Sequence, residues 1–348
     1  MSHKKNNFYS NRNIMSYDRN QFPFRFIIGA RGIGKTFSTG NLLCNLYHKV
    51  KNIPPHPLNV DDLFIYYRLK PKQLELMGDD ILDPKLQKKH NIKVRVIDKR
   101  IYFNDRYMGD LLALQDAPNH KGGVWEWSRY KYAIVDEFQL ERKERRTFDI
   151  IYNLRSSLES VTRFTTRVEE GLDFPIILFM GNTVDEATDL LYAFDFLPTK
   201  YGIYKLKKKN AIIEYVQDCA EYRDNQKRNP LRVLNVGNDF TFGEKTLKNR
   251  HNIIDPYNVG HRRFIAFLHL TEYVKLEVWS TQKGHLYISR GLPTKKFENR
   301  HHVIHKYAAN KGTTYNIEFH KLIRKHYAEN NIYFDKRITA QIFNQNIV

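Results

Sequence analysis

A glycine-rich loop between an apolar run and an amphipathic segment constrains the fold of this chain more than any other feature. Residues 24–28 form a short apolar run typical of a buried strand, and residues 37–50 carry apolar side chains at helical spacing. The loop between them has the pattern Gly-x-x-x-x-Gly-Lys-Thr. A strand, a glycine loop and a helix in this order let backbone N–H groups wrap phosphate oxygens. The pattern predicts a phosphate-binding loop in an α/β sheet, with an ordinary glycine turn as the alternative.

The loop is expected to bind ATP and Mg²⁺. The residues expected to surround the phosphates are Gly29, Ala30, Arg31, Gly32, Ile33, Gly34, Lys35 and Thr36. Lys35 would reach the β- and γ-phosphates as a point charge, and the Thr36 hydroxyl would face Mg²⁺. The following helix would direct the positive end of its dipole toward the phosphates.

Two adjacent carboxylates follow a second apolar run, at residues 132–135. Open α/β sheets bind ligands at the carboxyl ends of their strands, so Asp136 is expected to hold Mg²⁺ and Glu137 to polarise the attacking water. A helix-capping acid would give the same local pattern. The position downstream of a phosphate-binding loop favours hydrolysis. Asn182, after the strand expected at 175–180, is a candidate sensor of the γ-phosphate or a local turn residue.

Phosphoryl transfer needs cations besides Lys35, and an arginine finger can come from a neighbouring subunit. The candidates are Arg31, Lys121, Arg155, Arg163 and Arg167. For any single arginine a solvated surface position is the commoner role. Lys121 lies in a polar loop before the Asp136 strand, and the last three arginines follow that strand.

Composition sets the class of partner. The formal net charge is +19, which favours a polyanion: nucleic acid first and an anionic membrane surface second, with a merely soluble basic protein as the plain alternative. Two cysteines cannot build a disulfide framework, and no apolar run reaches the roughly 18 residues of a membrane span. The polar N-terminus lacks a secretory signal. We therefore expect an intracellular protein without a membrane anchor.

The pattern of elements changes along the chain. Strands and helices alternate over about the first 200 residues, which indicates a parallel sheet. A helix is expected at 214–228. Strands are then expected at 264–270, 273–279 and 286–289, and helices at 314–326 and 336–346. We expect three domains, over residues 1–205, 206–255 and 256–348.

Several stretches together resemble one protein family. They are Ser16 to Arg19, Phe26 to Lys35, Ile134 to Phe138, and residues 264–293 with Val278-Trp279 and Leu286-Tyr-Ile288. They look like the genome-packaging ATPases of small phi29-like tailed phages. The likeness spans most of the chain and is strongest over 14–36 and 130–140.

This resemblance implies a fold, a partner and a place of action. The family has an additional-strand P-loop ATPase domain, a small linker domain and a C-terminal domain similar to RNase H-like nucleases. Its members form a homomeric ring, typically a pentamer, at the portal vertex of an empty prohead. There they drive double-stranded DNA inward with ATP, in some members with a structural RNA. The implied location is the host cytoplasm and the prohead, not the mature virion.

The resemblance also implies roles for single residues. Lys35 and Thr36 match the Walker A pair, and Asp136 and Glu137 the Walker B pair.

The remaining matches concern basic and aromatic residues. Lys121 falls where the family has a basic residue acting in trans, and Arg163 best matches the arginine finger. Arg167 is held in reserve because the spacing is longer here. Tyr17 and Arg19 are expected near the nucleotide base.

Residues 256–348 lack the clustered carboxylates of a two-metal nuclease. Their acidic residues are Glu272, Glu277, Glu298, Glu318, Glu329 and Asp335. We therefore expect an inactive nuclease-like domain that docks on nucleic acid or portal. The histidines at 301, 302 and 305 fit exposed surface positions or RNA contacts better than a metal site.

Two other functions stay open. One is a P-loop ATPase that binds nucleic acid without moving along it. The other is a terminase large subunit with an active nuclease. A nucleoside kinase would explain neither the carboxylate pair nor the net charge.

Overall fold

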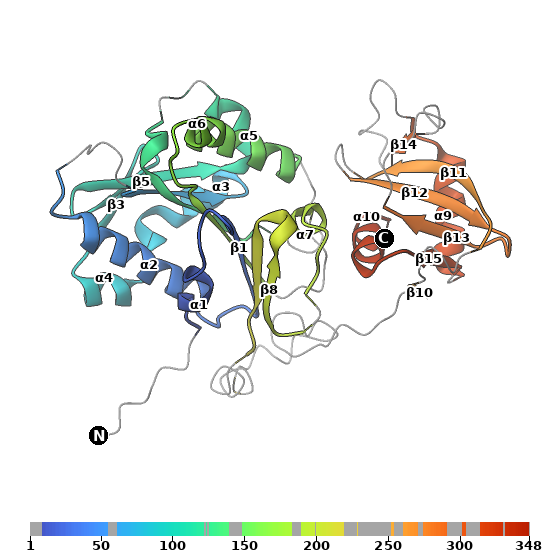
Figure 1. The fold of residues 1–348 in the computed structure, drawn as a ribbon, viewed down its shortest axis with the longest axis horizontal. Helices are drawn as coiled ribbons and strands as arrows, with labels where there is room; N and C mark the ends of the chain where they lie inside the picture. Colours follow the sequence, from blue (N-terminus) through green and yellow to red (C-terminus); the bar gives the residue numbers. More distant parts are fainter. Residues whose placement is uncertain are drawn as a thin grey trace. The chain divides into compact units, whose positions relative to one another are not determined.

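The described part of the chain forms two compact units. The computed structural model describes residues 9–54, 61–121, 123, 125–138, 148–182, 189–198, 200–218, 228, 252–253, 260–270, 274–290, 301–303, 314–329 and 331–347. The first unit comes from 1–184 and 198–246, and the second from 185–197 and 247–348 (Figure 1). The second unit thus takes a short segment from the middle of the chain.

The first unit consists of strands with helices between them. Its strands are β1 (Phe24–Ile28), β2 (Leu63–Arg68), β3 (Val94–Ile97), β4 (Arg100–Phe103), β5 (Arg106–Ala113), β6 (Tyr130–Asp136), β7 (Ile176–Gly181), β8 (Gly202–Leu206) and β9 (Ala211–Tyr215). Its α-helices are α1 (Arg12–Met15), α2 (Lys35–Val50), α3 (Pro71–Met77), α4 (Pro84–His90), α5 (Ile150–Thr162) and α6 (Phe164–Glu169). Its 3₁₀ helices are η1 (Gly78–Ile81), η2 (Leu114–His120), η3 (Trp127–Arg129) and η4 (Lys207–Lys209).

Within the described residues these strands form one nine-stranded sheet in the order β3-β4-β5-β2-β6-β7-β1-β9-β8. The six strands from β5 to β9 in this order run parallel to one another. At the edges, β3, β4 and β8 pair antiparallel with their neighbours. The predicted parallel α/β sheet is confirmed. Because all six parallel strands end at one edge, the residues that follow β1, β2, β6 and β7 are brought to the same side of the unit.

The central strands are apolar along their whole length because both faces of the sheet are covered. Helices α2 and α4 lie on one face, and α5 and α6 on the other (Figure 1). Ile27, Phe64 and Ile134 pack with Leu43 of α2 in one buried cluster. Side chains at the alternate strand positions point to the α5 face.

Three details differ from the expected pattern. The sequence analysis does not predict β5, which pairs with the β3–β4 hairpin, whose turn residues Asp98 and Lys99 both have positive φ. Residues 214–215 end strand β9 instead of beginning a helix. Residues 216–218 are not helical either, and residues 219–227 lie outside the described part of the chain. The sheet also continues past residue 205, through β9, so the residues just after that expected boundary belong to the first unit.

The second unit is built on a smaller mixed sheet. Its strands are β10 (Asn252–Ile253), β11 (Arg262–His269), β12 (Lys275–Thr281), β13 (Leu286–Ser289), β14 (His301–Val303) and β15 (Ile332–Phe334). Its helices are α7 (Asp189–Ala193), α9 (Ile317–Ala328) and α10 (Arg337–Ile347). The described strands are ordered β10-β15-β13-β12-β11-β14, with β11, β12 and β13 as an antiparallel meander and β14 parallel to β11. The expected α+β character is confirmed, and the likeness to a nuclease stays a prediction.

The α7 segment is fixed to the second unit by buried apolar side chains and by charge. Leu190, Leu191 and Tyr192 are all buried. The Arg290 guanidinium lies 4.6 Å from the centre of the Tyr192 ring. Asp195 pairs with Arg290 at 3.1 Å and with Lys336, in the turn before α10, at 2.9 Å.

A pair of histidines, of which His269 is buried and His301 partly buried, lies on the β11–β14 edge of the second unit. His269 Nε2 is 2.7 Å from His301 Nδ1. Burial, with Lys275 and the neighbouring histidines, lowers the pKa of His269 to about 4. The usual pKa of histidine is near 6.5. Between pH 6.5 and 4, His269 is therefore protonated in the unfolded chain but neutral in the folded chain.

We expect the second unit to lose up to about 3 kcal/mol of stability as the pH falls from 6.5 to 4. Urea unfolding followed by tryptophan fluorescence (Trp279 lies in β12) at several pH values measures this loss. His269→Asn should flatten the pH dependence in that window. An equally steep pH dependence in the variant would contradict the assignment.

No helix among the described residues is long and apolar enough to cross a membrane.

Candidate functional site

The loop after β1 has the backbone of a phosphate cradle. Gly32 and Gly34 have φ of 85° and 101°, values that side-chain-bearing residues rarely adopt. Gly29 has no room for a side chain, because a Cβ atom there would lie 2.5 Å from Ile33 Cδ1. The Ile33 side chain is buried and so holds the loop against the core. Helix α2 begins directly after Gly34. Thr36 and Arg31 remain exposed.

Lys35 is folded back onto the loop. Its Nζ donates to the carbonyl oxygens of Gly29 at 2.7 Å and Ala30 at 2.8 Å. Burial lowers its pKa to about 8, although Asp136 and the other nearby carboxylates act in the opposite direction. The two carbonyl oxygens are neutral and compensate little of the positive charge of the Lys35 ammonium group. A negatively charged phosphate would therefore bind this group more strongly than the carbonyls do.

The predicted carboxylate pair lies at the same edge of the sheet. Asp136 ends β6 and is buried, and it accepts a hydrogen bond of 2.7 Å from Tyr66 Oη. Burial raises the pKa of Asp136 and outweighs its cationic neighbours. The Glu137 backbone has φ of 55°, and its N–H donates to Met180 O of β7. This turn leaves the Glu137 side chain 46% exposed while that of Asp136 stays buried.

Arg68, which sequence reasoning did not find, holds both carboxylates. It ends β2, and its two terminal nitrogens lie 3.0 Å from Asp136 Oδ2 and 2.7 Å from Glu137 Oε2. Burial alone would lower the pKa of Arg68, but Asp136, Tyr66 and Glu137 together raise it. A polar residue at the end of an apolar strand was the one available signal.

ATP and Mg²⁺ fit this set of donors. The cradle offers backbone N–H groups and a lysine, and the exposed Thr36 hydroxyl and the Asp136 carboxylate are hard oxygen ligands of the kind Mg²⁺ prefers. Asn182 follows β7 next to Gly181, whose carbonyl accepts from Gly29 N at 3.3 Å. Its position beside the loop agrees with the sensor prediction, which stays a prediction.

A segment near the N-terminus also lies against the loop. The Tyr9 backbone N–H donates to Ile33 O at 3.1 Å, and the Asn11 N–H donates to Ser38 Oγ at 2.9 Å. Tyr9 Oη donates to Glu214 of β9 at 2.7 Å. No local sequence pattern indicates this contact, because it joins residues far apart in the chain.

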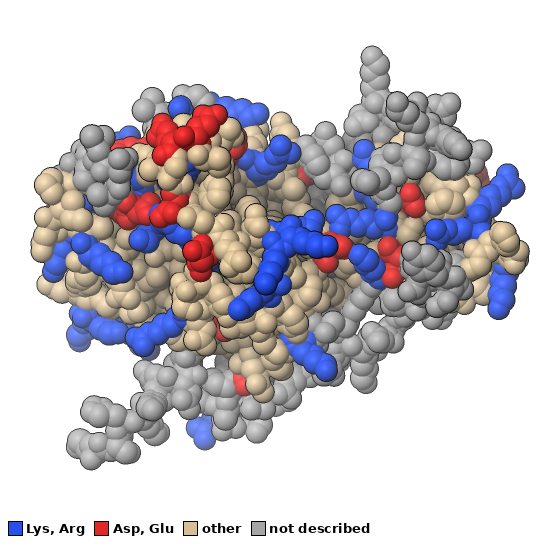
Figure 2. Space-filling view, viewed as in Figure 1, with Lys and Arg blue, Asp and Glu red and all other residues tan. Residues whose placement is uncertain are grey.

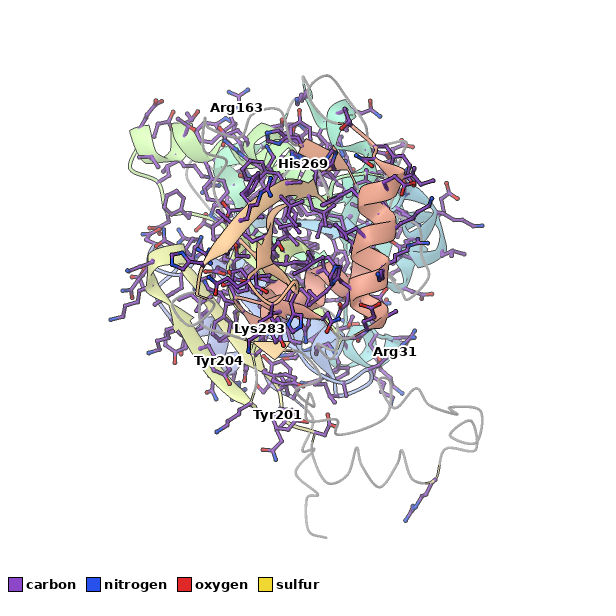
Figure 3. The ribbon with its side chains drawn as sticks, turned by 90° about the vertical axis from the view of Figure 1, so that its right-hand side faces the viewer. Arg31, Arg163, Tyr201, Tyr204, His269 and Lys283 are labelled. Atoms are coloured by element: carbon purple, nitrogen blue, oxygen red, sulfur yellow. The ribbon has the colours of Figure 1, made fainter. Side chains whose placement is uncertain are left out.

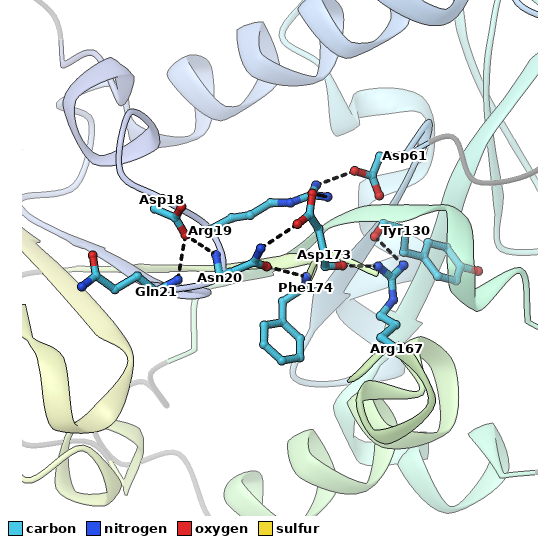
Figure 4. Close-up of polar contacts among 9 residues, drawn as sticks. All are labelled: Asp18, Arg19, Asn20, Gln21, Asp61, Tyr130, Arg167, Asp173 and Phe174. Atoms are coloured by element: carbon cyan, nitrogen blue, oxygen red, sulfur yellow. Dashed lines mark hydrogen bonds and ion pairs between the residues drawn. The ribbon is translucent and has the colours of Figure 1, made fainter. Parts of the chain in front are cut away.

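The structure contradicts the expected place of Tyr17 and Arg19. Tyr17 O accepts from Arg25, near the start of β1, and the Tyr17 ring lies 4.5 Å from Lys205 Nζ. Arg19 pairs with Asp61 and Asp173, which precede β2 and β7 (Figure 4). Both residues therefore lie at the amino ends of the strands, about 16 Å, the length of β1, from the phosphate loop.

Lys121 and Arg163, the two cations expected to act in trans, lie at opposite ends of α5. Lys121 is exposed, and its Nζ is 5.8 Å from the Tyr152 ring in the first turn. Arg163 follows the last turn with φ of 45°, and its side chain points outward (Figure 3). At 1.5 Å per residue, about 16 Å of helix separates Tyr152 from Arg163. Arg163 is therefore not brought to the phosphate loop of its own chain. Arg155 is exposed on α5 between them.

Arg167, the reserve finger, is buried and fully engaged. Its guanidinium donates to the backbone carbonyls of Asp173 and Tyr130 (Figure 4). It also donates to those of Thr162 and Trp127. The side chain is 1% exposed, and burial lowers its pKa. A group held this way cannot reach a neighbouring subunit, so Arg163 and Arg155 remain as candidates.

In the second unit the described residues hold no group of three acidic, histidine or cysteine side chains placed to bind a metal. Glu277 accepts from Trp279 Nε1 and Ser289 Oγ. The Nδ1 atom of His301 lies 2.7 Å from His269 Nε2. Residue 305 lies outside the described part of the chain.

No protein-family model matches the sequence, and no curated protein is similar to it. Solved structures share its fold. A chain of "The Phi-28 gp11 DNA packaging Motor" matches with a TM-score of 0.63 and 16% identity, over 99% of this chain and 98% of that one. A chain of "The bacteriophage Phi-29 viral genome packaging motor assembly" matches with a TM-score of 0.64 and 17% identity, over 97% and 98%. The expected resemblance is confirmed at the level of the fold.

Proposed function

We propose that this protein is an ATP-driven motor that moves double-stranded viral DNA into a prohead. One observation carries the proposal: a phosphate cradle and an Asp-Glu pair meet at one sheet edge in a chain whose fold follows DNA packaging motors over nearly its full length. The subunits would form a homomeric ring, pentameric by the family resemblance, at the portal vertex. Whether a structural RNA takes part stays a prediction.

ATP hydrolysis would begin with a change of partners. Lys35 would leave the carbonyls of Gly29 and Ala30 and neutralise the phosphates, while Thr36 and Asp136 hold Mg²⁺. The bound metal ion supplies charge neutralisation at the phosphates. Glu137 must be free of Arg68 to polarise water, because a carboxylate paired with a guanidinium accepts a proton poorly. Arg68 thus keeps the site inactive until the nucleotide is in place.

The finger would come from the neighbouring subunit. Arg163 lies at the sheet edge opposite its own phosphate loop, so it can complete an active site only in trans. Lys121 lies at the other end of α5. One bound phosphate group therefore contacts both only if α5 or the loop moves.

DNA would be held through its phosphates, which makes binding independent of sequence and sensitive to salt. Basic side chains are spread over the face seen in Figure 2, and acidic ones gather near α6. The net charge of +19 supports such binding.

The decisive measurement is ATP hydrolysis with and without double-stranded DNA. We expect DNA to stimulate the wild type, and Glu137→Gln and Arg163→Ala to be inactive alone. An equimolar mixture of the two variants should regain activity at about one quarter of its interfaces, where an intact Glu137 meets an intact Arg163.

Absence of regain would contradict a trans role of Arg163, and Arg155→Ala would be mixed next. Movement along DNA can be followed by the displacement of a third strand bound to the duplex. If DNA leaves the hydrolysis rate unchanged and no third strand is displaced, the ATPase that binds nucleic acid without moving along it is favoured. Mg²⁺-dependent cutting of DNA would favour the terminase with an active nuclease.

A further inference from the structure

A buried chain of three polar side chains joins the strand beside the carboxylate pair to the loop that carries Lys121. Tyr67 Oη lies 2.9 Å from Ser157 Oγ, which lies 2.6 Å from His120 Nδ1. The three residues come from β2, α5 and η2, and all are buried. His120 directly precedes Lys121 in the chain.

The whole η2 segment is fixed to α5. Asn153 Nδ2 donates to Leu114 O at 2.8 Å at the start of η2, and the Ser157–His120 contact fixes its end. Trp125 Nε1 donates to His120 O at 3.0 Å and closes the loop over the histidine. The backbone at Lys121 is therefore set by where the His120 ring sits.

The contact is neutral. Burial lowers the pKa of His120 to about 4, so at pH 7 the ring carries no charge and Nδ1 makes a single hydrogen bond to the hydroxyl. A short, buried hydrogen bond with one available partner fixes a direction well, because each alternative leaves a buried polar atom unsatisfied. Ser157 is fully buried, so water cannot replace it.

We propose that Ser157 and His120 are positioning residues that hold Lys121 where it acts on the nucleotide of the neighbouring subunit. This rests on the proposed function, in which Lys121 acts in trans. Displacing a group by about 1 Å costs on the order of 100-fold in rate, and the contact lies one residue from Lys121. The Ser157 hydroxyl also contacts Tyr67, the residue before Arg68. One oxygen atom therefore links the carboxylate site of a subunit with the Lys121 that the same subunit contributes to its neighbour.

The test is ATP turnover of full-length Ser157→Ala with DNA. We expect kcat to fall about 10-fold with little change in KM, because the binding groups are untouched and the misplaced group acts in the transition state. Mixing with Glu137→Gln should raise activity above both parents, because the Glu137→Gln subunit lends an intact Lys121. A loss of stability alone would not be repaired by a partner subunit. A mixture no better than the mean of its parents overturns the proposal.

A second pair of variants covers the case that Ser157→Ala folds poorly. His120→Asn keeps a polar atom near Nδ1 and should retain most activity, while His120→Leu should behave like Ser157→Ala. Equal loss in both would contradict positioning. Ser160→Ala is the matched control, since its hydroxyl donates only to Ser156 O of the same helix. Its activity should equal wild type, and an equal loss there would overturn the proposal.

A parallel mixture separates the two levels of inference. Lys121→Ala mixed with Glu137→Gln should recover if Lys121 acts in trans. Failure there removes the trans role, and with it this inference. Recovery there, with none for Ser157→Ala, overturns the positioning role alone.

Discussion

Glu137→Gln should lower ATP turnover by at least about 100-fold, the usual minimum contribution of a general base. Gln keeps the size of the side chain but cannot accept the proton of the attacking water. Arg68 keeps its contact with Asp136 at 3.0 Å, so the edge of the sheet should stay folded. Nucleotide binding should remain close to wild type, because the cradle and Lys35 are unchanged. Single-turnover hydrolysis and binding of a fluorescent ATP analogue measure the two separately.

The matched control is Glu169→Gln, an exposed carboxylate at the end of α6. It should hydrolyse ATP like the wild type. Weak binding together with slow turnover in Glu137→Gln would show that Glu137 serves the folded loop and not the water, and would contradict the assignment.

Arg167→Leu should destabilise the first unit by about 3 kcal/mol or more, because breaking a buried hydrogen-bond network is one of the mechanisms behind the largest losses. The leucine fills part of the space but removes the donor of four carbonyl groups, two of them in buried contacts, and buried unsatisfied acceptors are costly. Urea unfolding of the full chain, followed by circular dichroism, measures the loss.

Arg163→Ala is the comparison, four residues earlier in the chain. Its exposed side chain should leave stability almost unchanged while turnover falls. The two arginines would thus separate into a folding role and a proposed functional one. A stable Arg167→Leu variant would contradict the buried network, and a destabilised Arg163→Ala variant would leave the finger assignment without support.

Sequence reasoning found the parts of the site that are local in the chain. The loop from Gly29 to Thr36 and the Asp136–Glu137 pair each occupy one strand end, and strand ends are marked by an apolar run followed by polar residues. Their meeting followed from the parallel sheet, since carboxyl ends gather at one edge. The fold of the first unit was predictable for the same reason.

Contacts between distant segments were out of reach. Arg68 is one polar residue after an apolar strand, and nothing in its neighbourhood tells which carboxylate it meets. Arg19 was placed near the nucleotide by the family resemblance, but β1 carries the chain from one edge of the sheet to the other between Arg19 and the loop. Arg167 lies in a polar stretch that gives no sign of burial, which arises only when α6 packs against the start of β6.

The middle of the chain has a consequence for dissecting this protein. After β7 the chain gives α7 to the second unit and then returns to the first unit as β8. A fragment cut after β9 would keep α7 but lose Arg290 and Lys336, the cations that pair with Asp195. Leu190, Leu191 and Tyr192 would then lose the surface that buries them. Truncation at any single residue therefore cannot separate the units cleanly, and a fragment of the first unit needs residues 185–197 replaced by a short polar linker.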